Sequence, residues 1–364
     1  MKLRCERDTL VDALQTAGRA VSGRGGQLPV LSGLHLALEG DQLAVTGSDV
    51  ELTIARTLTV NGDREGSAVV PARLLIDVIR SLEPGAIELD LNELDLTIRG
   101  GRSDFSIRTI PTDEFPQLVT AEGPAVTLEA SSFVEALRQV VPAASSDDSR
   151  PILTGVLMTP VEVGLRLVAT DSYRLAVADI PGASVLEGDQ SVLVPSRALA
   201  EVRRVVGEAP ELTLRLGESD ASFEVDGLVV TTRLIDGDFP KYEGLIPSGP
   251  SNEMAANREM VLEAVRRVRL LAQESTPIRL VMNADGLEIV AITQDVGEGH
   301  ETVDARYEGE ELTVAFNPQF LLDGLDVAPG EEVKLQTIDS LKPAVLRSPD
   351  SEHFLYLLMP VRVP

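Results

Sequence analysis

Apolar and polar residues alternate along much of the chain. The segments LHLALEG (34–40), QLAVTGS (42–48) and LDLTIRG (94–100) place an apolar residue at nearly every second position, which predicts half-buried β-strands. Turn sequences between such runs favour antiparallel pairing. Two other segments, at 7–21 and from Pro71 onward, have apolar residues at helical spacing, for example Leu10 and Leu14. The first part of the chain is therefore predicted to run helix, strands, helix, strands.

This pattern occurs three times. VVPARLL (69–75), LVPSRAL (193–199) and AFNPQFL (315–321) place prolines at 71, 195 and 318, which are 124 and 123 residues apart. The helical segments TLVDALQTA (9–17), SFVEALRQV (132–140) and MVLEAVRRV (260–268) recur in the same way. A unit of this length exceeds the ~20–50 residues of a solenoid repeat and is a domain in its own right. We predict three similar α+β domains, 1–122, 123–250 and 251–364, each with two helices packed on antiparallel sheets.

Composition narrows the class of protein. The 364 residues include one cysteine, Cys5, and three distant histidines, so we expect Cys5 to be packed and predict no zinc site or other cofactor. The charged start MKLRCERDTL lacks the apolar region of a signal peptide, which leads us to expect a cytoplasmic protein. The net charge of −26 argues against nucleic acid, unless the 32 basic residues gather on one surface.

Basic residues do recur on the helices. Arg73, Asp77 and Arg80 share one face of the second helix, and Arg197, Glu201 and Arg204 repeat them at a distance of 124 residues. In the third copy Gln319, Asp323 and Asp326 stand there instead, and Gln15, Arg138 and Arg266 are equivalent in the first helices. Such faces are either solvated surfaces with ion pairs or a basic stripe that contacts phosphates. With 3% aromatic residues and no tryptophan, base stacking is not expected, so DNA contacts would be independent of sequence.

Other motifs carry little chemistry. The loop GRGG (23–26) lacks a nucleotide-binding fingerprint, although Arg24 can approach a phosphate. The pair Asp147-Asp148 is either a metal ligand set or a loop, and it has no third ligand nearby. Asp49 and Thr170-Asp171 occur at equivalent positions and are expected to form turns. The absence of catalytic motifs therefore favours a scaffold over an enzyme, and the arginine helices leave open a scaffold that binds DNA and one that does not.

Charge also differs between the two ends of the chain. Arg99, Arg102 and Arg108 lie on strands of the first repeat, whereas the third repeat has an acidic segment with Glu298, Glu301 and Asp304. Opposite charges at two strand edges suit head-to-tail pairing between copies. Such a contact gives a ring or a filament, depending on whether the rotation closes.

Several motifs resemble one family over the whole length: VPARLL, ATDSYRLA, FP.Y..LIP, FNPQFLLDGL and YLLMPVR. The chain resembles the bacterial replicative sliding clamp, the β subunit of DNA polymerase III. The resemblance implies the DNA-clamp fold, a head-to-tail homodimeric ring around duplex DNA, and no catalytic activity. The ring would tether the replicative polymerase, the clamp loader and other proteins that carry short hydrophobic peptides.

The resemblance also implies a peptide pocket between the second and third repeats. A terminal strand that simply caps its sheet is the alternative for the apolar chain end, and Leu355 and Leu357 should point inward in either case. Glu243 and Gly244 replace an expected basic residue, Ser275 an aromatic one, and Leu341 is large, so we expect altered ligand selectivity. The predicted pocket comprises Leu153, Thr170, Ser172, Tyr173, Arg174, Leu175, Pro240, Leu245, Asn317, Phe320, Leu341, Pro343, Leu358, Met359, Pro360, Val361 and Arg362.

Two further sets complete the predictions. We expect Leu74, Leu75, Val78, Ile79 and Leu82 to bury on the second helix. The predicted DNA contacts are Arg24, Arg73, Arg80, Arg138, Arg150, Arg197, Arg204 and Arg266. The predicted dimer interface comprises Leu74, Val78, Arg99, Arg102, Arg108, Leu270, Glu298, Glu301 and Asp304.

Overall fold

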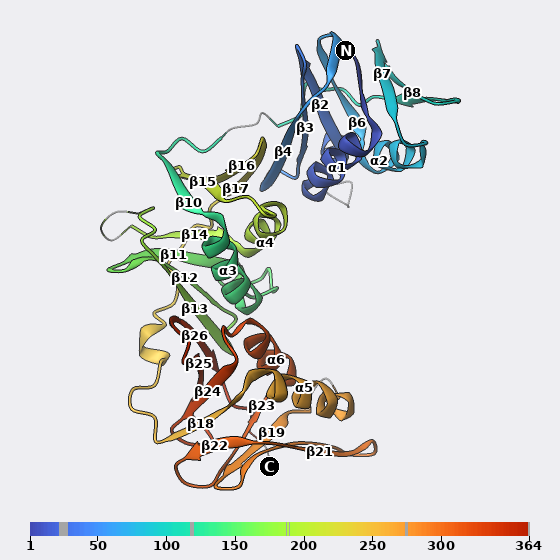
Figure 1. Ribbon diagram of the computed structural model, residues 1–364. Coiled ribbons are helices and arrows are strands. Elements are labelled where there is room, and N and C mark those ends of the chain that lie inside the picture. Colours follow the sequence, from blue (N-terminus) through green and yellow to red (C-terminus); the bar gives the residue numbers. More distant parts are fainter. Residues whose placement is uncertain (22–27, 117–119, 187, 189, 274–275, 363–364) are drawn as a thin grey trace. The chain divides into compact units, whose positions relative to one another are not determined.

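The computed structural model describes residues 1–21, 28–116, 120–186, 188, 190–273 and 276–362. The chain divides into two compact units, one of Met1–Ser131 with Arg197–Leu234 and one of Ser132–Ser196 with Ile235–Pro364. Figure 1 shows helices and long antiparallel strands in each unit. The α+β class and the antiparallel pairing are therefore confirmed for the described residues.

Two antiparallel sheets form the first unit. The five-stranded sheet has the order β5 (Asn61–Arg64), β1 (Lys2–Glu6), β7 (Ala86–Asn92), β8 (Asp95–Gly100), β9 (Ser103–Arg108). The eight-stranded sheet has the order β10 (Ala125–Glu129), β15 (Glu211–Leu216), β16 (Asp220–Val225), β17 (Leu228–Arg233), β4 (Leu52–Thr59), β3 (Gln42–Ser48), β2 (Gly33–Glu39), β6 (Gly66–Pro71). The pairing of β17 with β4 joins strands of the first and second repeats into one continuous sheet.

The helices of the first unit are α1 (Arg7–Ala17), α2 (Ala72–Ser81) and α4 (Ser196–Val205), with short 3₁₀ turns at Gly18–Ala20 and Pro29–Ser32. Helices α1 and α2 lie side by side at the blue end of the chain in Figure 1. Leu10, Leu14, Leu75 and Ile79 are completely buried in one cluster with the sheet residues. Each such side chain contributes roughly 1.5–3 kcal/mol by leaving water, so the apolar stripe fixes both helices on the sheets.

One expectation for α2 is wrong. Leu74 is 50% exposed and Val78 is only partly buried, whereas Leu75, Ile79 and Leu82 are buried as expected. The stripe that faces the core runs through Ala72, Leu75 and Ile79 at spacings of three and four. Leu74 and Val78 form a neighbouring stripe that nothing within the described chain covers fully.

The second unit also has two antiparallel sheets. The nine-stranded sheet has the order β14 (Val192–Pro195), β11 (Gly155–Val161), β12 (Gly164–Thr170), β13 (Arg174–Pro181), β26 (Ser351–Leu358), β25 (Ala344–Ser348), β24 (Glu332–Thr337), β18 (Asn252–Asn257), β22 (Ala305–Glu308). The four-stranded sheet has the order β21 (Gly297–Val303), β20 (Gly286–Thr293), β19 (Ile278–Asn283), β23 (Leu312–Phe316). Strands β13 and β26 join the second and third repeats, just as β17 and β4 join the first two.

The helices here are α3 (Ala130–Val140), α5 (Arg258–Val268) and α6 (Pro318–Val327), with 3₁₀ turns at Val141–Ala143, Pro151–Thr154, Glu243–Leu245 and Arg269–Leu271. The Asn317 side chain caps α6 by accepting hydrogen bonds from the backbone amides of Gln319 (2.8 Å) and Phe320 (3.3 Å). Pro318 is then the first helical residue, whereas Pro71 precedes α2 and Pro195 precedes α4. The three prolines are therefore not at equivalent positions; Pro71, Pro195 and Asn317 are.

A turn with unusual backbone geometry occurs in both units. Val50 has φ +80° and Ser172 has φ +81°. In each turn a hydroxyl accepts from that residue's amide and the preceding aspartate accepts from the next two amides, as Asp49 does from Glu51 (3.2 Å) and Leu52 (2.8 Å). The expectation that Asp49 and Thr170-Asp171 form turns is confirmed.

Val50 is a β-branched residue held in a left-handed conformation and is 42% exposed. We expect Val50→Asn to raise the free energy of unfolding by about 1 kcal/mol, because asparagine tolerates this conformation and little apolar contact is lost. Urea unfolding measures the gain. Val50→Thr is the matched control, since it keeps the β-branch; equal stability of the two variants would contradict the strain argument.

Cys5 on β1 is partly buried, and burial raises the pKa of its thiol from its ordinary value of 9.0 to about 12. Because the thiolate is the reactive form, its fraction near neutral pH falls by about a thousandfold. We expect a thiol reagent at pH 8 to label Cys5 in the folded protein far more slowly than in urea. Equal labelling rates in the two conditions would show that the thiol is accessible and reactive.

Among the described residues, no helix has the length and apolar character that a membrane crossing requires. The same residues hold no cluster of three or more histidine, cysteine, aspartate or glutamate side chains suited to a metal ion.

Candidate functional site

The arginines on the helices are exposed and paired. Arg80 lies 3.5 Å from Asp77, Arg204 lies 3.0 Å from Glu201, and Arg266 lies 2.7 Å from Glu263. Each pair joins residues three positions apart on one helix, so the side chains meet on the same face. The solvated-face interpretation predicted ion pairs of this kind, although at a spacing of four. Pairing and contact with phosphates are compatible, because these guanidinium groups remain about half exposed.

Three other predicted DNA contacts have structural partners as well. Arg197 on α4 donates to Asp49 at 2.5 Å, within the first unit. Arg150 binds Asp147 at 2.9 Å; hydrogen bonds from Ser149 and then from Arg150 hold the pKa of that carboxyl below its usual range. The Asp147-Asp148 segment is thus a loop held by its own hydrogen bonds, in agreement with the loop interpretation.

Arg138 is held most firmly of this group. It makes two hydrogen bonds to Glu135, at 2.7 and 2.8 Å, and donates to the carbonyls of Asp326 (2.8 Å) and Val327 (3.0 Å) at the end of α6. A cation at a helix C-terminus also interacts favourably with the helix dipole. Arg73 has no hydrogen bond or ion pair within the described residues, which leaves it the freest of these arginines. Arg24 lies outside the described residues.

A compact cluster forms where the turn at 171–174 meets α6. Arg174 is 9% exposed, donates to Asp171 (3.0 Å), Asp323 and the Tyr356 hydroxyl (3.2 Å), and lies 4.4 Å above the centre of the Phe320 ring. Burial raises the pKa of Tyr356 far above its usual range. The guanidinium group thereby holds β13, β26 and α6 together through charge-assisted hydrogen bonds.

Exposed aromatic and apolar side chains occur next to this cluster and elsewhere among the predicted pocket residues. Tyr173 stacks on Phe320 with ring centres 6.4 Å apart, and the backbone amide of Met359 donates to the Tyr173 carbonyl at 2.9 Å. Tyr173 is 60% exposed, Leu245 is 51% exposed, and Met359 and Val361 are 38% and 37% exposed. Exposed apolar surface around a rigid polar cluster is suited to a short apolar ligand.

The remaining predicted pocket residues differ in exposure. Thr170, Leu175 and Leu358 are buried, so they support this surface rather than contact a ligand in this conformation. The Asn317 side-chain oxygen is occupied as the cap of α6. Leu153, Ser172, Pro240, Leu341, Pro343, Pro360 and Arg362 are partly or fully exposed. Leu341 is 62% exposed, Glu243 and Gly244 open the 3₁₀ turn that contains Leu245, and Ser275 lies outside the described residues.

Leu355 and Leu357 are buried as expected, in a cluster with Leu175 and Tyr242. The predicted pocket includes Pro240 and Leu245 from the segment that packs on this cluster, but it missed Phe239 and Tyr242, whose rings lie edge to face with centres 6.4 Å apart. Sequence patterns also missed Asp323 and Tyr356 as partners of Arg174. Only Asp323 was recognisable in the sequence, because it is the acidic residue of α6 at the position that Asp77 occupies in α2 and Glu201 in α4.

Most of the predicted interface residues lie on or next to two sheet edges, whereas Leu74 and Val78 lie on α2. Strand β9 is the outer strand of the five-stranded sheet, and β21 is the outer strand of the four-stranded sheet. Arg99 pairs with Glu88 and Asp104 within its own unit, and Arg267 holds Glu301 at 2.7 Å. Arg102, Glu298 and Asp304 have no hydrogen bond or ion pair among the described side chains. Leu270 is 84% exposed.

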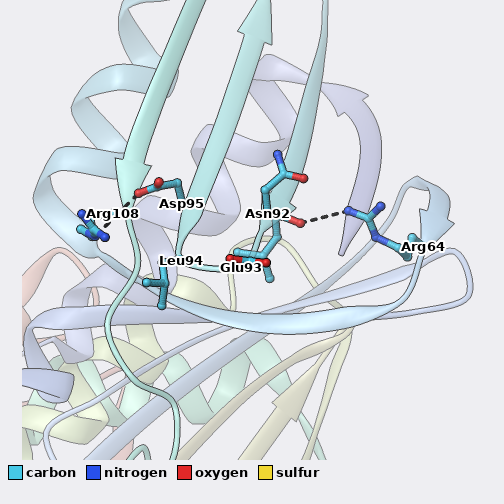
Figure 2. Close-up of a pocket in the computed structure, with 7 residues that line it drawn as sticks. Arg64, Asn92, Glu93, Leu94, Asp95 and Arg108 are labelled. Carbon is cyan, nitrogen blue, oxygen red and sulfur yellow. Dashed lines mark hydrogen bonds and ion pairs between the residues drawn. The ribbon is translucent and has the colours of Figure 1, made fainter.

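Figure 2 shows a separate pocket of about 670 Å³ at the end of the five-stranded sheet. Arg108 lies beside Asp95 at 3.9 Å, and Arg64 on the other side donates to the Leu91 carbonyl at 3.0 Å and pairs with Asp90. Glu93 and Leu94 form the turn between them. Its charges are largely balanced and no nucleophile lines it, so the pocket offers no catalytic arrangement.

Known proteins of one family match this chain over its whole length. Three family models match in succession: the N-terminal domain of the DNA polymerase III beta subunit at 1–119, its central domain at 127–241 and its C-terminal domain at 243–362. The beta sliding clamp of Streptomyces coelicolor is 34% identical and that of Bacillus subtilis 31% identical, each covering 100% of both chains. A sliding clamp from Pseudomonas aeruginosa, solved bound to griselimycin, superposes with a TM-score of 0.93 at 30% identity over 100% of both chains. The chain therefore belongs to the family of bacterial beta sliding clamps, the beta subunit of DNA polymerase III.

Proposed function

We propose that this chain is a DNA sliding clamp that closes head to tail with a second copy around duplex DNA. The observation that carries the proposal is the recurrence of exposed arginines at equivalent helix positions in a chain of net charge −26. Sparse cations on the helices give weak contacts without sequence preference, while the acidic remainder repels DNA elsewhere. A ring needs no tight binding, because its topology retains the DNA.

The dimer would form between the two open edges. Strand β9 of one copy would pair with β21 of its partner, which satisfies unpaired backbone groups on both strands. Leu74 on α2 and Leu270 beside α5 supply the apolar surface that such a contact buries, and Arg102 and Glu298 supply opposite charges. The same interface occurs twice in a closed dimer, so the ring has no remaining edge of this kind.

The clamp would act by tethering rather than by chemistry. The exposed surface around Tyr173, Phe320 and Met359 is suited to a short peptide with hydrophobic anchors, of the kind expected in a replicative polymerase or a clamp loader. We place the domain limits at 122 and 250, and assign the protein no catalytic residue.

The topology of binding tests this function. The protein is loaded on nicked circular DNA, washed with salt, and the DNA is then linearised. A closed ring stays on circular DNA through the wash and leaves when an end is created. Loss in the salt wash, with no effect of linearisation, would show ordinary electrostatic binding and contradict encirclement.

A further inference from the structure

Carboxylates recur along the helices more regularly than arginines do. Each of the six α-helices in the described residues has a carboxylate at the same helix position: Asp12, Asp77, Glu135, Glu201, Glu263 and Asp323. An arginine follows three residues later in four of them, at Arg80, Arg138, Arg204 and Arg266. In α1 that place is taken by Gln15, so helix stabilisation by an ion pair does not account for the acid in every copy.

The arginines are paired with these carboxylates but remain exposed to solvent. The Arg80, Arg204 and Arg266 side chains are 61%, 58% and 47% exposed while paired. A guanidinium group paired in this way carries almost no net charge toward a distant phosphate. A DNA phosphate that binds the exposed side of the guanidinium group competes with the carboxylate for its charge, and fewer counterions leave the DNA per contact.

We propose that the carboxylates paired with the helix arginines, Asp77, Glu201 and Glu263, act as built-in competitors of DNA phosphates and keep each arginine contact weak. The inference rests on the proposed encirclement of DNA, and it assigns a role to acids on the helices that would otherwise oppose binding. Exposed pairs at this spacing hold with a strength that corresponds to about a twofold change in affinity each. Several such contacts would slow a ring markedly if they were not weakened.

Arg266 keeps a second carboxylate, because Asp326 lies 3.4 Å from it. Arg138 keeps even more partners. Besides Glu135, it is held by the carbonyls of Asp326 and Val327. Loss of the Glu135 charge therefore leaves Arg138 bound to the end of α6. We expect Glu135→Gln to change DNA affinity less than Asp77→Asn, and Glu263→Gln to lie between them because Asp326 still pairs with Arg266.

The test compares two full-length triple variants with equal net charge. Asp77→Asn, Glu201→Gln and Glu263→Gln are combined in one, and Glu39→Gln, Glu162→Gln and Glu218→Gln, all exposed and unpaired in the described residues, in the control. Binding to a short fluorescent linear duplex is measured by anisotropy between about 50 and 200 mM salt. We expect the helix variant to bind about fivefold to tenfold more tightly, with a salt dependence steeper by about 0.9 for each freed arginine that contacts a phosphate. The control should show a small gain and an unchanged slope.

Equal gains and equal slopes in the two variants would overturn the inference, since only global charge would then matter. Glu201 also lies 3.6 Å from Arg19, so thermal melting of the triple variant is checked. If its melting falls, the single variant Asp77→Asn decides, with about a twofold gain expected and no gain contradicting the proposal. Retention of the wild-type protein on circular DNA is measured separately, so that failure of encirclement is distinguished from failure of this inference.

Discussion

Arg174→Ala should lower the free energy of unfolding by about 3–5 kcal/mol, because it leaves two carboxylates without their cation in a largely buried site. Asp171 is 8% exposed, and the Asp323 side chain is 22% exposed. Both accept hydrogen bonds from Arg174, and the Phe320 ring loses the guanidinium above it. Urea unfolding measures the loss, and we expect binding of a hydrophobic clamp-binding peptide to weaken in parallel.

Two variants sharpen this test. Arg204→Ala removes an exposed arginine from its pair with Glu201 and should cost at most about 1 kcal/mol. The double variant Arg174→Met with Asp323→Asn should be more stable than Arg174→Ala. Methionine keeps an apolar side chain in place of the arginine stem, and asparagine removes the unpaired charge of Asp323. If Arg174→Ala lowers the free energy of unfolding no more than Arg204→Ala does, the cluster does not hold α6 to the turn at 171–174.

The sequence was sufficient for the repeated architecture because helix and strand periods are local properties. Leu75 and Ile79, or Leu355 and Leu357, are buried as their spacing predicts. Leu74 was predicted wrongly because periodicity identifies an apolar stripe of a helix but not where the buried part of the stripe ends. Residues at its edge, such as Leu74, can remain exposed in the single chain. The proline of the third copy lies one residue further along because Asn317 occupies the place before the helix, but Gln319, Asp323 and Asp326 were aligned correctly with the corresponding residues of α2 and α4.

The site was less predictable from sequence, because its contacts join distant segments. Arg174 meets Asp323 and Tyr356 only after β13 pairs with β26. Likewise Arg197 donates to Asp49, and Arg138 donates to the carbonyl of Val327 at the end of α6. These residues are far apart in the sequence, so no local sequence pattern predicts the contacts. The ion pairs within one helix, such as Asp77 with Arg80, are local and were foreseen except for their spacing.

Leu270→Glu should separate the dimer while leaving each chain folded. Leu270 is 84% exposed in the single chain, so the substitution removes little internal packing. At the centre of an interface, a charge in place of an apolar anchor costs at least about 2 kcal/mol. A closed head-to-tail dimer contains the interface twice, so the cost doubles and the dissociation constant should rise by about a thousandfold. Light scattering coupled to size exclusion measures the change.

Val163→Glu is the matched control, since Val163 is also exposed, at 48%, but lies in the turn between β11 and β12. It should remain dimeric, and a dimeric Leu270→Glu protein would contradict the role of Leu270. The salt dependence separates the two forces at the interface. Salt would screen the proposed contact of Arg102 with the acidic edge of the partner copy, but it does not weaken apolar burial. If Leu270 provides most of the stability, the wild-type dimer persists at high salt; if the charged edges provide it, the wild-type protein dissociates there and Leu270→Glu adds little.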